Sequence, residues 1–525
     1  MNQNGRRRAG VLIPLFACPS STSWGIGDIG DVAAIARWLA GAGQRVLQLL
    51  PINEMASGQQ SPYSAMSAMA IDPIFIRVND VPEFGAIGGE QSLDRDDRAR
   101  LARVREAAYV DYPTVRALKQ RALRSAFEHF EEHEWCRDTA RARRLTAYVD
   151  AERWWIDDYA LFRALHEREQ GRAWTEWPAP LRSRAPQALA QARHELADEI
   201  RFRQYLQWIA DEQWRGARTA ARELGVELFG DLPFMVDGDS ADVWAHQSDF
   251  RLDASVGVPP DAFSATGQDW GMPAYRWDAI AQQDFRWLRD RARRSAALYD
   301  GYRIDHLVGF YRTYSRPRNG GVPSFEPATE AEQQQLGERL MTVFREPGAE
   351  VFAEDLGVVP DFVRDSLAQL QIAGFRVFRW ERDWSIDGQP FRDPFRYPAL
   401  SVATSGTHDT EPMAIWWDEA PVTEKQMIAK LPGVQQAAGS ALLDAPFNPT
   451  VRDAILETLF GSGSNLVLMP VQDLFGWRER INVPATVGEK NWTYRLPWAS
   501  DRLDDQPEAQ ERKQKLREWT EKYQR

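Results

Sequence analysis

Eight short apolar runs recur along the chain, and each is followed by polar or glycine-rich residues. Runs of this length are typical of strands that are buried on both faces. They cover residues 10–17, 45–52, 226–236, 298–304, 350–353, 374–380, 401–405 and 465–470. Stretches with helical apolar spacing separate them, for example 32–42 and 361–372. This alternation predicts an α/β fold, a (β/α)8 barrel of the TIM type, in which the loops after the strands carry the chemistry.

The spacing of the runs is uneven, which predicts large helical insertions into a single catalytic barrel that spans residues 1–525. Segments 115–133 and 151–170 have helical periodicity, so we expect residues 92–224 to form a helical subdomain between the second and third strands. A smaller helical insertion is predicted at 411–459, and a polar terminal helix at 501–525. We expect no separate C-terminal β-domain.

Composition narrows the possible partners. The chain has 525 residues, of which 43% are hydrophobic, enough for a large core. The net charge of −12 argues against nucleic acid or an anionic membrane as the main partner. The 21 tryptophans fit either a large core or stacking on sugar rings. With two cysteines, Cys18 and Cys136, and no HExxH motif among seven histidines, we predict neither a disulfide framework nor a metal site.

The N-terminus allows two interpretations. Three arginines followed by AGVLIPLFAC resemble a short secretory signal, whereas the same residues also fit the first strand of the fold. Pro14 interrupts the short apolar run, and Phe16 is large for a position near a cleavage site. We therefore favour a strand and a cytoplasmic protein. No run of about 18 apolar residues is present, so no membrane span is expected.

Three carboxylates follow the fourth, fifth and seventh predicted strands. They are Asp305 in RIDH, Glu354 in AEDLG and Asp409 in GTHD. Each alone could be structural, as we expect for Asp355, but barrel geometry brings all three to one mouth. Arg303 would keep Asp305 ionised, and partial burial would raise the pKa of Glu354. An ionised carboxylate, a protonated one and a third acid match retaining glycoside chemistry.

Aromatic and amide side chains near the same strand ends could bind sugar. Tyr63 lies in SPYS after the second strand, and Asn482 follows the eighth. Residues 257–277, GVPPDAFSATGQDWGMPAYRW, are predicted to form a long ordered loop because glycine and proline are frequent there. Within it, Gln268 and Trp270 offer a hydrogen-bonding group and a stacking face, while Trp277 is expected in the core.

These motifs resemble those of the 4-α-glucanotransferases, also called amylomaltases or disproportionating enzymes, of glycoside hydrolase family 77. The resemblance runs nearly end to end. It includes STSWGIGDIGD, SPYS, GDLP with DSADVW, GVPPDxFSxTGQxWG, WWIDDYALFRAL, RIDH, AEDLG, GTHD, RINVPAT and NWTYR.

The resemblance implies a residue-by-residue assignment. Asp305 would be the nucleophile, Glu354 the acid/base and Asp409 the stabiliser of the transition state. The groups that would hold the nucleophile or bind substrate are Arg303, His306, His408, Tyr63, Asp261, Gln268, Trp270 and Asn482. The implied reaction moves a glucosyl chain from an α-1,4-glucan donor to the 4-hydroxyl of an acceptor sugar, without a cofactor.

The chain departs from the family pattern where acceptor sugars would bind. Ala262 replaces an aromatic residue, Met272 an asparagine and Ala485 a glycine, and residues 307–326 are atypical. Losing the aromatic residue at position 262 could favour water as acceptor, so an α-1,4-glucan hydrolase is the close alternative. A catalytically silent glucan-binding protein is a further alternative, against which the three retained carboxylates argue.

Overall fold

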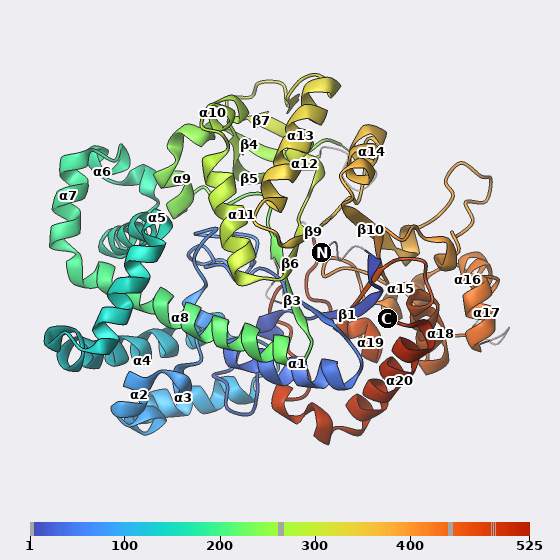
Figure 1. The fold of residues 1–525 in the computed structure, drawn as a ribbon, viewed down its shortest axis with the longest axis horizontal. Coiled ribbons are helices and arrows are strands. Elements are labelled where there is room, and N and C mark those ends of the chain that lie inside the picture. Colours follow the sequence, from blue (N-terminus) through green and yellow to red (C-terminus); the bar gives the residue numbers. More distant parts are fainter. Residues whose placement is uncertain (1–4, 261–266, 439–444, 485, 487, 489) are drawn as a thin grey trace.

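The computed structural model describes residues 5–260, 267–438, 445–484, 486, 488 and 490–525. Eight parallel strands close into a barrel in the order β1-β12-β11-β10-β9-β6-β3-β2 (Figure 1). Their bounds are β1 Arg8–Leu12, β2 Val46–Gln48, β3 Glu227–Leu232, β6 Gly301–Ile304, β9 Glu350–Ala353, β10 Ala373–Val377, β11 Ser401–Thr404 and β12 Leu466–Pro470. Each strand overlaps one of the eight predicted runs, so the predicted barrel is confirmed.

The barrel interior is filled by side chains from six of its strands. The cluster comprises Val46, Phe229, Phe352, Phe375, Val377, Val402, Leu466 and Leu468. Every residue of β1, β2, β6, β11 and β12 is buried. Burial on both faces explains why these strands read as continuous apolar runs and not as an alternating pattern.

The described part of the chain also contains twenty α-helices. They are α1 Val32–Gly41, α2 Pro82–Ala86, α3 Arg95–Glu106, α4 Tyr112–His133, α5 Ala140–Arg168, α6 Ala179–Arg182, α7 Pro186–Glu195, α8 Ala197–Glu223, α9 Ala241–Ala245, α10 Trp277–Gln282, α11 Arg286–Leu298, α12 Val308–Tyr311, α13 Glu330–Arg345, α14 Asp361–Gln369, α15 Met413–Glu419, α16 Val422–Ala429, α17 Pro432–Ala438, α18 Pro449–Phe460, α19 Val471–Phe475 and α20 Pro507–Tyr523. None of the described helices is long and apolar enough to cross a membrane.

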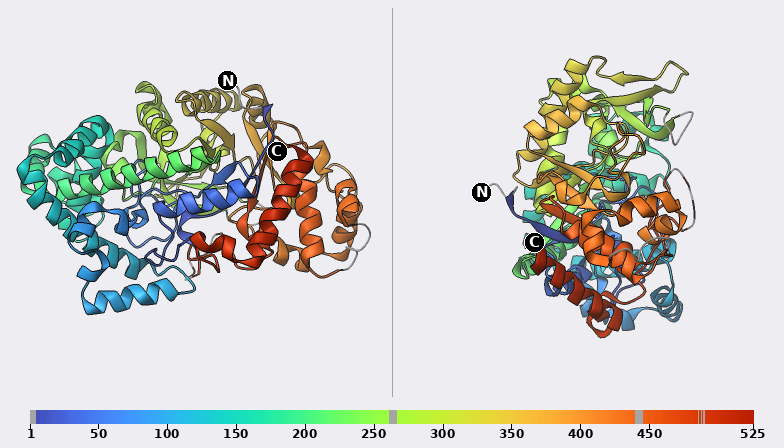
Figure 2. Two further views of the ribbon diagram at one scale, coloured as in Figure 1. Left: turned by 60° about the horizontal axis from the view of Figure 1, so that its bottom comes forward. Right: turned by 90° about the vertical axis from the view of Figure 1, so that its right-hand side faces the viewer.

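Helices α3–α8 lie between β2 and β3, and α15–α18 lie between β11 and β12. The two groups stand on opposite sides of the barrel (Figures 1 and 2). Side-chain caps fix where several helices of the chain begin: Asp111 accepts from the Thr114 amide at the start of α4, and Thr329 with Glu332 forms a capping box at α13. Treating residues 92–224 as a subdomain stays a prediction.

A four-stranded antiparallel sheet beside the barrel was not predicted. Its order is β5-β4-β7-β8, with β4 Phe250–Val258, β5 Gln268–Tyr275, β7 Thr313–Pro317 and β8 Ser324–Glu326. The prediction of one long loop over residues 257–277 is therefore wrong at both ends, where β4 and β5 pair. Gly271 and Pro273 lie inside β5 and conceal it in the sequence, because both residues are rare in strands. Trp277 is buried, as predicted.

Candidate active site

The three carboxylates lie at one end of the barrel. Asp305 directly follows β6, Glu354 directly follows β9, and Asp409 lies five residues beyond the end of β11. Because all eight strands are parallel, their carboxyl ends share a rim. Arg303 contacts Asp305 and Glu354, and Asp409 is connected to Arg303 through His408, Tyr63 and Asp231.

Arg303 is the centre of these contacts. Its Nη1 donates to both carboxylate oxygens of Asp231, at 2.8 and 2.7 Å. Its Nη2 lies 2.9 Å from Asp305 Oδ1 and 3.7 Å from Glu354 Oε2. Burial alone would lower the pKa of the guanidinium, but the surrounding carboxylates raise it, so Arg303 stays charged.

Glu354 occupies a site that favours its protonated form. Burial raises the pKa of this carboxyl to about 8; the positive charge of Arg303 opposes the shift, and the negative charge of Asp305 reinforces it. The backbone N–H of His306 donates to Glu354 Oε2 at 2.7 Å. Glu354 can therefore carry a proton at neutral pH and release it to a leaving group.

His306 adopts a left-handed backbone conformation, with φ of 43°. Such a conformation is strained for a residue with a side chain, and here it accompanies the hydrogen bond from the His306 backbone N–H to Glu354. Burial lowers the pKa of the imidazole to about 4, so the ring is neutral at pH 7. Trp270 packs edge-on against the ring at 4.8 Å between centroids, and its indole N–H donates to Gln268 Oε1 at 3.2 Å.

Asp409 is held in its ionised form. Its Oδ2 lies 3.3 Å from His408 Nε2, and its Oδ1 accepts a hydrogen bond from the Asn482 amide at 2.6 Å. Desolvation would raise the pKa of Asp409, but His408 and Asn482 outweigh it and hold the pKa well below its usual range. The site thus contains one protonated and one firmly ionised carboxyl group.

Tyr63 closes the site on the side of His408. The two rings stack with centroids 5.2 Å apart, and the Tyr63 hydroxyl donates to Asp231 Oδ2 at 2.7 Å. Trp492 lies against both rings, at 5.7 and 5.8 Å. These rings provide the kind of apolar surface on which a sugar stacks.

The structure thus brings together all the predicted site residues that it describes; Asp261 lies outside the described residues. It also adds Asp231 and Trp492, which were not predicted as site residues. Asp231 is in β3, opposite Arg303 of β6 in the strand register. The position of Asp231 in the GDLP motif, near a predicted strand end, was the feature of the sequence that could have indicated its place in the site. Asp355 accepts from the Phe375 amide and lies near two arginines, in keeping with the structural role expected for it.

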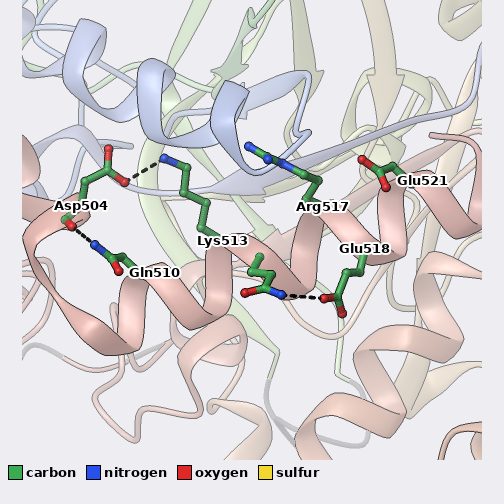
Figure 3. A pocket seen from close by; sticks show the side chains of 7 residues that line it. Asp504, Gln510, Lys513, Arg517, Glu518 and Glu521 are labelled. Carbon is green, nitrogen blue, oxygen red and sulfur yellow. Dashed lines mark hydrogen bonds and ion pairs between the residues drawn. The ribbon is translucent and has the colours of Figure 1, made fainter.

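Two further observations concern possible metal binding and a hollow elsewhere on the molecule. Among the residues that the structure describes, no group of three or more histidine, cysteine, aspartate or glutamate side chains is arranged to hold a metal ion. A hollow of about 630 Å³ along α20 contains none of the predicted site residues (Figure 3). Several of its side chains pair with one another, as Lys513 with Asp504 and Gln514 with Glu518.

Comparison with known proteins places the chain in a family. A model of the family described as 4-alpha-glucanotransferase matches residues 13–501. Curated 4-alpha-glucanotransferases from Thermus thermophilus and Chlamydia pneumoniae are 33% and 31% identical; the alignments cover 96% and 93% of this chain and 99% and 91% of those proteins.

Solved structures agree. An amylomaltase from Streptococcus agalactiae in complex with acarbose superposes with a TM-score of 0.82 at 27% identity, covering 99% of this chain and all of that one. An amylomaltase from Corynebacterium glutamicum shares the fold, with a TM-score of 0.81 at 24% identity, over 97% of this chain and 75% of that one. The chain therefore belongs to the 4-alpha-glucanotransferases, the amylomaltases of glycoside hydrolase family 77.

Proposed function

We propose that this 4-α-glucanotransferase works by a retaining double displacement, with Asp305 as nucleophile and Glu354 as acid/base. The donor is an α-1,4-glucan, and the acceptor is the 4-hydroxyl of a second sugar. Membership of the family supports the transfer activity. The contacts around Arg303 support the division of roles.

In the first step, a carboxylate oxygen of Asp305 attacks the anomeric carbon. The bond from that carbon to the glycosidic oxygen breaks, and the Glu354 proton passes to the leaving oxygen. The Arg303 guanidinium lies 2.9 Å from Asp305, while burial keeps Glu354 protonated. Asp409, ionised and fixed by Asn482, offsets the positive charge that develops on the sugar ring.

In the second step, Glu354 is a carboxylate and accepts the proton of the acceptor hydroxyl. That oxygen attacks the same carbon, the ester to Asp305 breaks, and Glu354 remains protonated for the next turnover. Tyr63, His306 and His408 contact the sugar in this step; the stacking of Tyr63 on His408 and the neutral state of His306, which can donate one hydrogen bond, support these roles.

One observation carries the proposal: a single nitrogen of Arg303 serves both reacting carboxylates. Since Nη2 lies 2.9 Å from Asp305 Oδ1 and 3.7 Å from Glu354 Oε2, these oxygens are separated by no more than the two distances together. Retaining enzymes hold their carboxyl groups about 5 Å apart, whereas inverting enzymes need about 6.5–9.5 Å. The limit of about 6.6 Å includes the retaining distance and excludes all but the lower edge of the inverting range, so it favours retention.

The test is incubation of the purified protein with maltotriose alone, followed by separation of the products by chain length. We expect a ladder of longer oligosaccharides plus glucose, with no net gain of reducing ends. Maltose and glucose with rising reducing ends would contradict transfer and establish the hydrolase. An Asp305→Asn variant is the control and should form no products.

A further inference from the structure

Asp409 lies on a loop, unlike the other two carboxylates of the site. Asp305 and Glu354 directly follow strands β6 and β9, whereas Asp409 lies five residues beyond the end of β11. Residues 405–412, which we call the Asp409 loop, contain no helix or strand and connect β11 to α15. The position of Asp409 therefore depends on what holds this loop.

A single buried carboxylate holds both ends of the Asp409 loop. Asp473 Oδ2 accepts a hydrogen bond from the hydroxyl of Ser405, the first residue of the loop, at 2.5 Å. Its Oδ1 accepts from the backbone N–H of Met413, the residue directly after the loop, at 2.6 Å. Asp473 is in α19, which follows β12, and β12 is a neighbour of β11 in the barrel. The Ser405 distance is typical of a hydrogen bond to an ionised carboxylate, which is about twice as strong as a neutral one.

Arg379 holds the same loop from the other neighbouring strand, β10. It lies just beyond the end of that strand and is buried. Its Nη1 donates to the backbone carbonyl of Glu411 at 3.0 Å and to the Glu411 carboxylate at 2.6 Å, and its Nε donates to the Ser405 carbonyl at 3.3 Å. Burial lowers the pKa of the guanidinium, while the negative charges of Asp473 and Glu411 oppose the shift. Asp473 therefore also stabilises the charge of the arginine that binds the loop.

Arg480 links the loop to the side chain that binds Asp409. Its Nη2 donates to the backbone carbonyl of Asp409 at 2.9 Å, and its Nε donates to the carbonyl of Asn482 at 3.1 Å. The Asn482 amide in turn donates to Asp409 Oδ1 at 2.6 Å, and His408 lies 3.3 Å from Oδ2. A shift of the loop would therefore disturb the contacts that fix the Asp409 carboxylate.

We propose that Asp473 is a positioning residue for the transfer reaction: it fastens both ends of the Asp409 loop and so keeps the Asp409 carboxylate against Asn482 and His408. The inference rests on the proposed function for the role of Asp409. Both oxygens of Asp473 are engaged by groups at the ends of the loop, so it acts on the reaction through Asp409 and not by contact with substrate. Because misplacing a catalytic group by about 1 Å can cost about 10²-fold in rate, this fastening controls turnover.

The test removes the fastening in steps. Ser405→Ala deletes one of the two hydrogen bonds, and Asp473→Ala deletes both. With maltotriose as substrate, we expect kcat to fall about ten-fold in Ser405→Ala and about 10²-fold in Asp473→Ala, with KM unchanged. Asp473→Asn should recover most of the turnover, because an amide of the same shape can accept from Met413 and donate to Ser405.

Ser401→Ala is the matched control. Ser401 is the first residue of β11, whereas Ser405 directly follows the last, and both side chains are buried. The Ser401 hydroxyl also forms short hydrogen bonds, to the Pro398 carbonyl at 2.6 Å and with the Ser464 hydroxyl at 2.7 Å. We expect Ser401→Ala to lower the melting temperature and to leave kcat unchanged.

Two results would overturn the proposal: an unchanged kcat in Ser405→Ala and Asp473→Ala, or equal losses of kcat in Ser405→Ala and Ser401→Ala. Thermal melts of each variant identify loss of folding, and Ser405→Ala alone decides the test if Asp473→Ala does not fold. Asp409→Asn is measured alongside. If Asp409→Asn stays active, the role of Asp409 in the proposed function is refuted. If it is inactive while Ser405→Ala and Asp473→Ala keep full activity, only the positioning role of Asp473 is refuted.

Discussion

The three carboxyl groups of the site are chemically alike, yet their surroundings differ. Burial raises the pKa of Glu354 to about 8, whereas His408 and Asn482 keep Asp409 ionised. Asp305 lies 2.9 Å from the permanently charged Arg303. Separate environments for paired acids are how one site supplies both a proton donor and a nucleophile.

The pH dependence should report Glu354. Its pKa is raised, so the proton is present below about pH 8 and is lost as the pH rises through that value. We expect kcat/KM for maltotriose to fall on the alkaline side with this midpoint. Glu354→Gln should reduce turnover by about 10³-fold and remove the alkaline limb, because the amide neither donates nor accepts this proton.

The neighbouring carboxylate is the control for this prediction. Asp355 is buried and accepts from the Phe375 amide. Asp355→Asn should lower the melting temperature and leave the alkaline limb near pH 8. A profile of the unaltered protein that stays flat to well above pH 8 would contradict the assignment of Glu354.

At the scale of elements, adjacent strands position the site. Register pairs Asp231 of β3 with Arg303 of β6, and Arg303 with Phe352 of β9. The planar guanidinium of Arg303 then lies between the ends of β3 and β9. One of its nitrogens binds Asp231, and another contacts the two reacting carboxylates. A rigid strand scaffold holds such groups more accurately than a loop.

Arg303→Lys tests this arrangement. A single ammonium cannot serve Asp231 and the reacting carboxylates at once, so we expect kcat/KM to fall by about 10²-fold with the fold retained. Arg294→Lys is the matched control. Arg294 lies away from the site and makes a similar buried bidentate pair with Asp211, with N–O distances of 2.9 and 3.1 Å. It should lose stability but not kcat/KM. Equal losses of kcat/KM in both variants would contradict a specific role for Arg303.

At the scale of the whole molecule, the two ends of the barrel have separate tasks. The carboxyl ends of the strands carry the catalytic groups, whereas the amino ends carry an ion network. Arg8, the first residue of β1, contacts Glu227 at the start of β3 and Glu350 at the start of β9, at 2.5 and 2.7 Å. This network joins strands that are not neighbours and stabilises the barrel at the amino ends of its strands.

Arg8→Met should therefore reduce stability without altering the chemistry. Two carboxylates lose their partner, and we expect the free energy of unfolding to fall by about 2 kcal/mol. Denaturant titration measures the loss, while kcat/KM well below the melting temperature should be unchanged. Adding Glu227→Gln and Glu350→Gln should recover much of the stability; failure to recover it would show that packing of Arg8, and not its charge, matters.

Element by element, local patterns were sufficient for the barrel but not for the sheet beside it. The strands of the barrel are buried on both faces, and this leaves a clear apolar signature. In the antiparallel sheet, β5 carries exposed and half-buried residues with an internal glycine and proline. Its pairing with β4 depends on contacts distant in sequence, so no local pattern reveals it.

The sequence by itself determined the eight-stranded barrel and the three carboxylates, because apolar runs and motifs are local features of the chain, although several strands end three to five residues before the predicted runs do. Only the tertiary structure decided how these groups interact. Asp231 enters the site through strand register, and Trp492 reaches Tyr63 from a segment more than 400 residues away. The pKa of Glu354 depends on burial among β6, β9 and their loops, which is a property of the assembled barrel mouth and of no single segment.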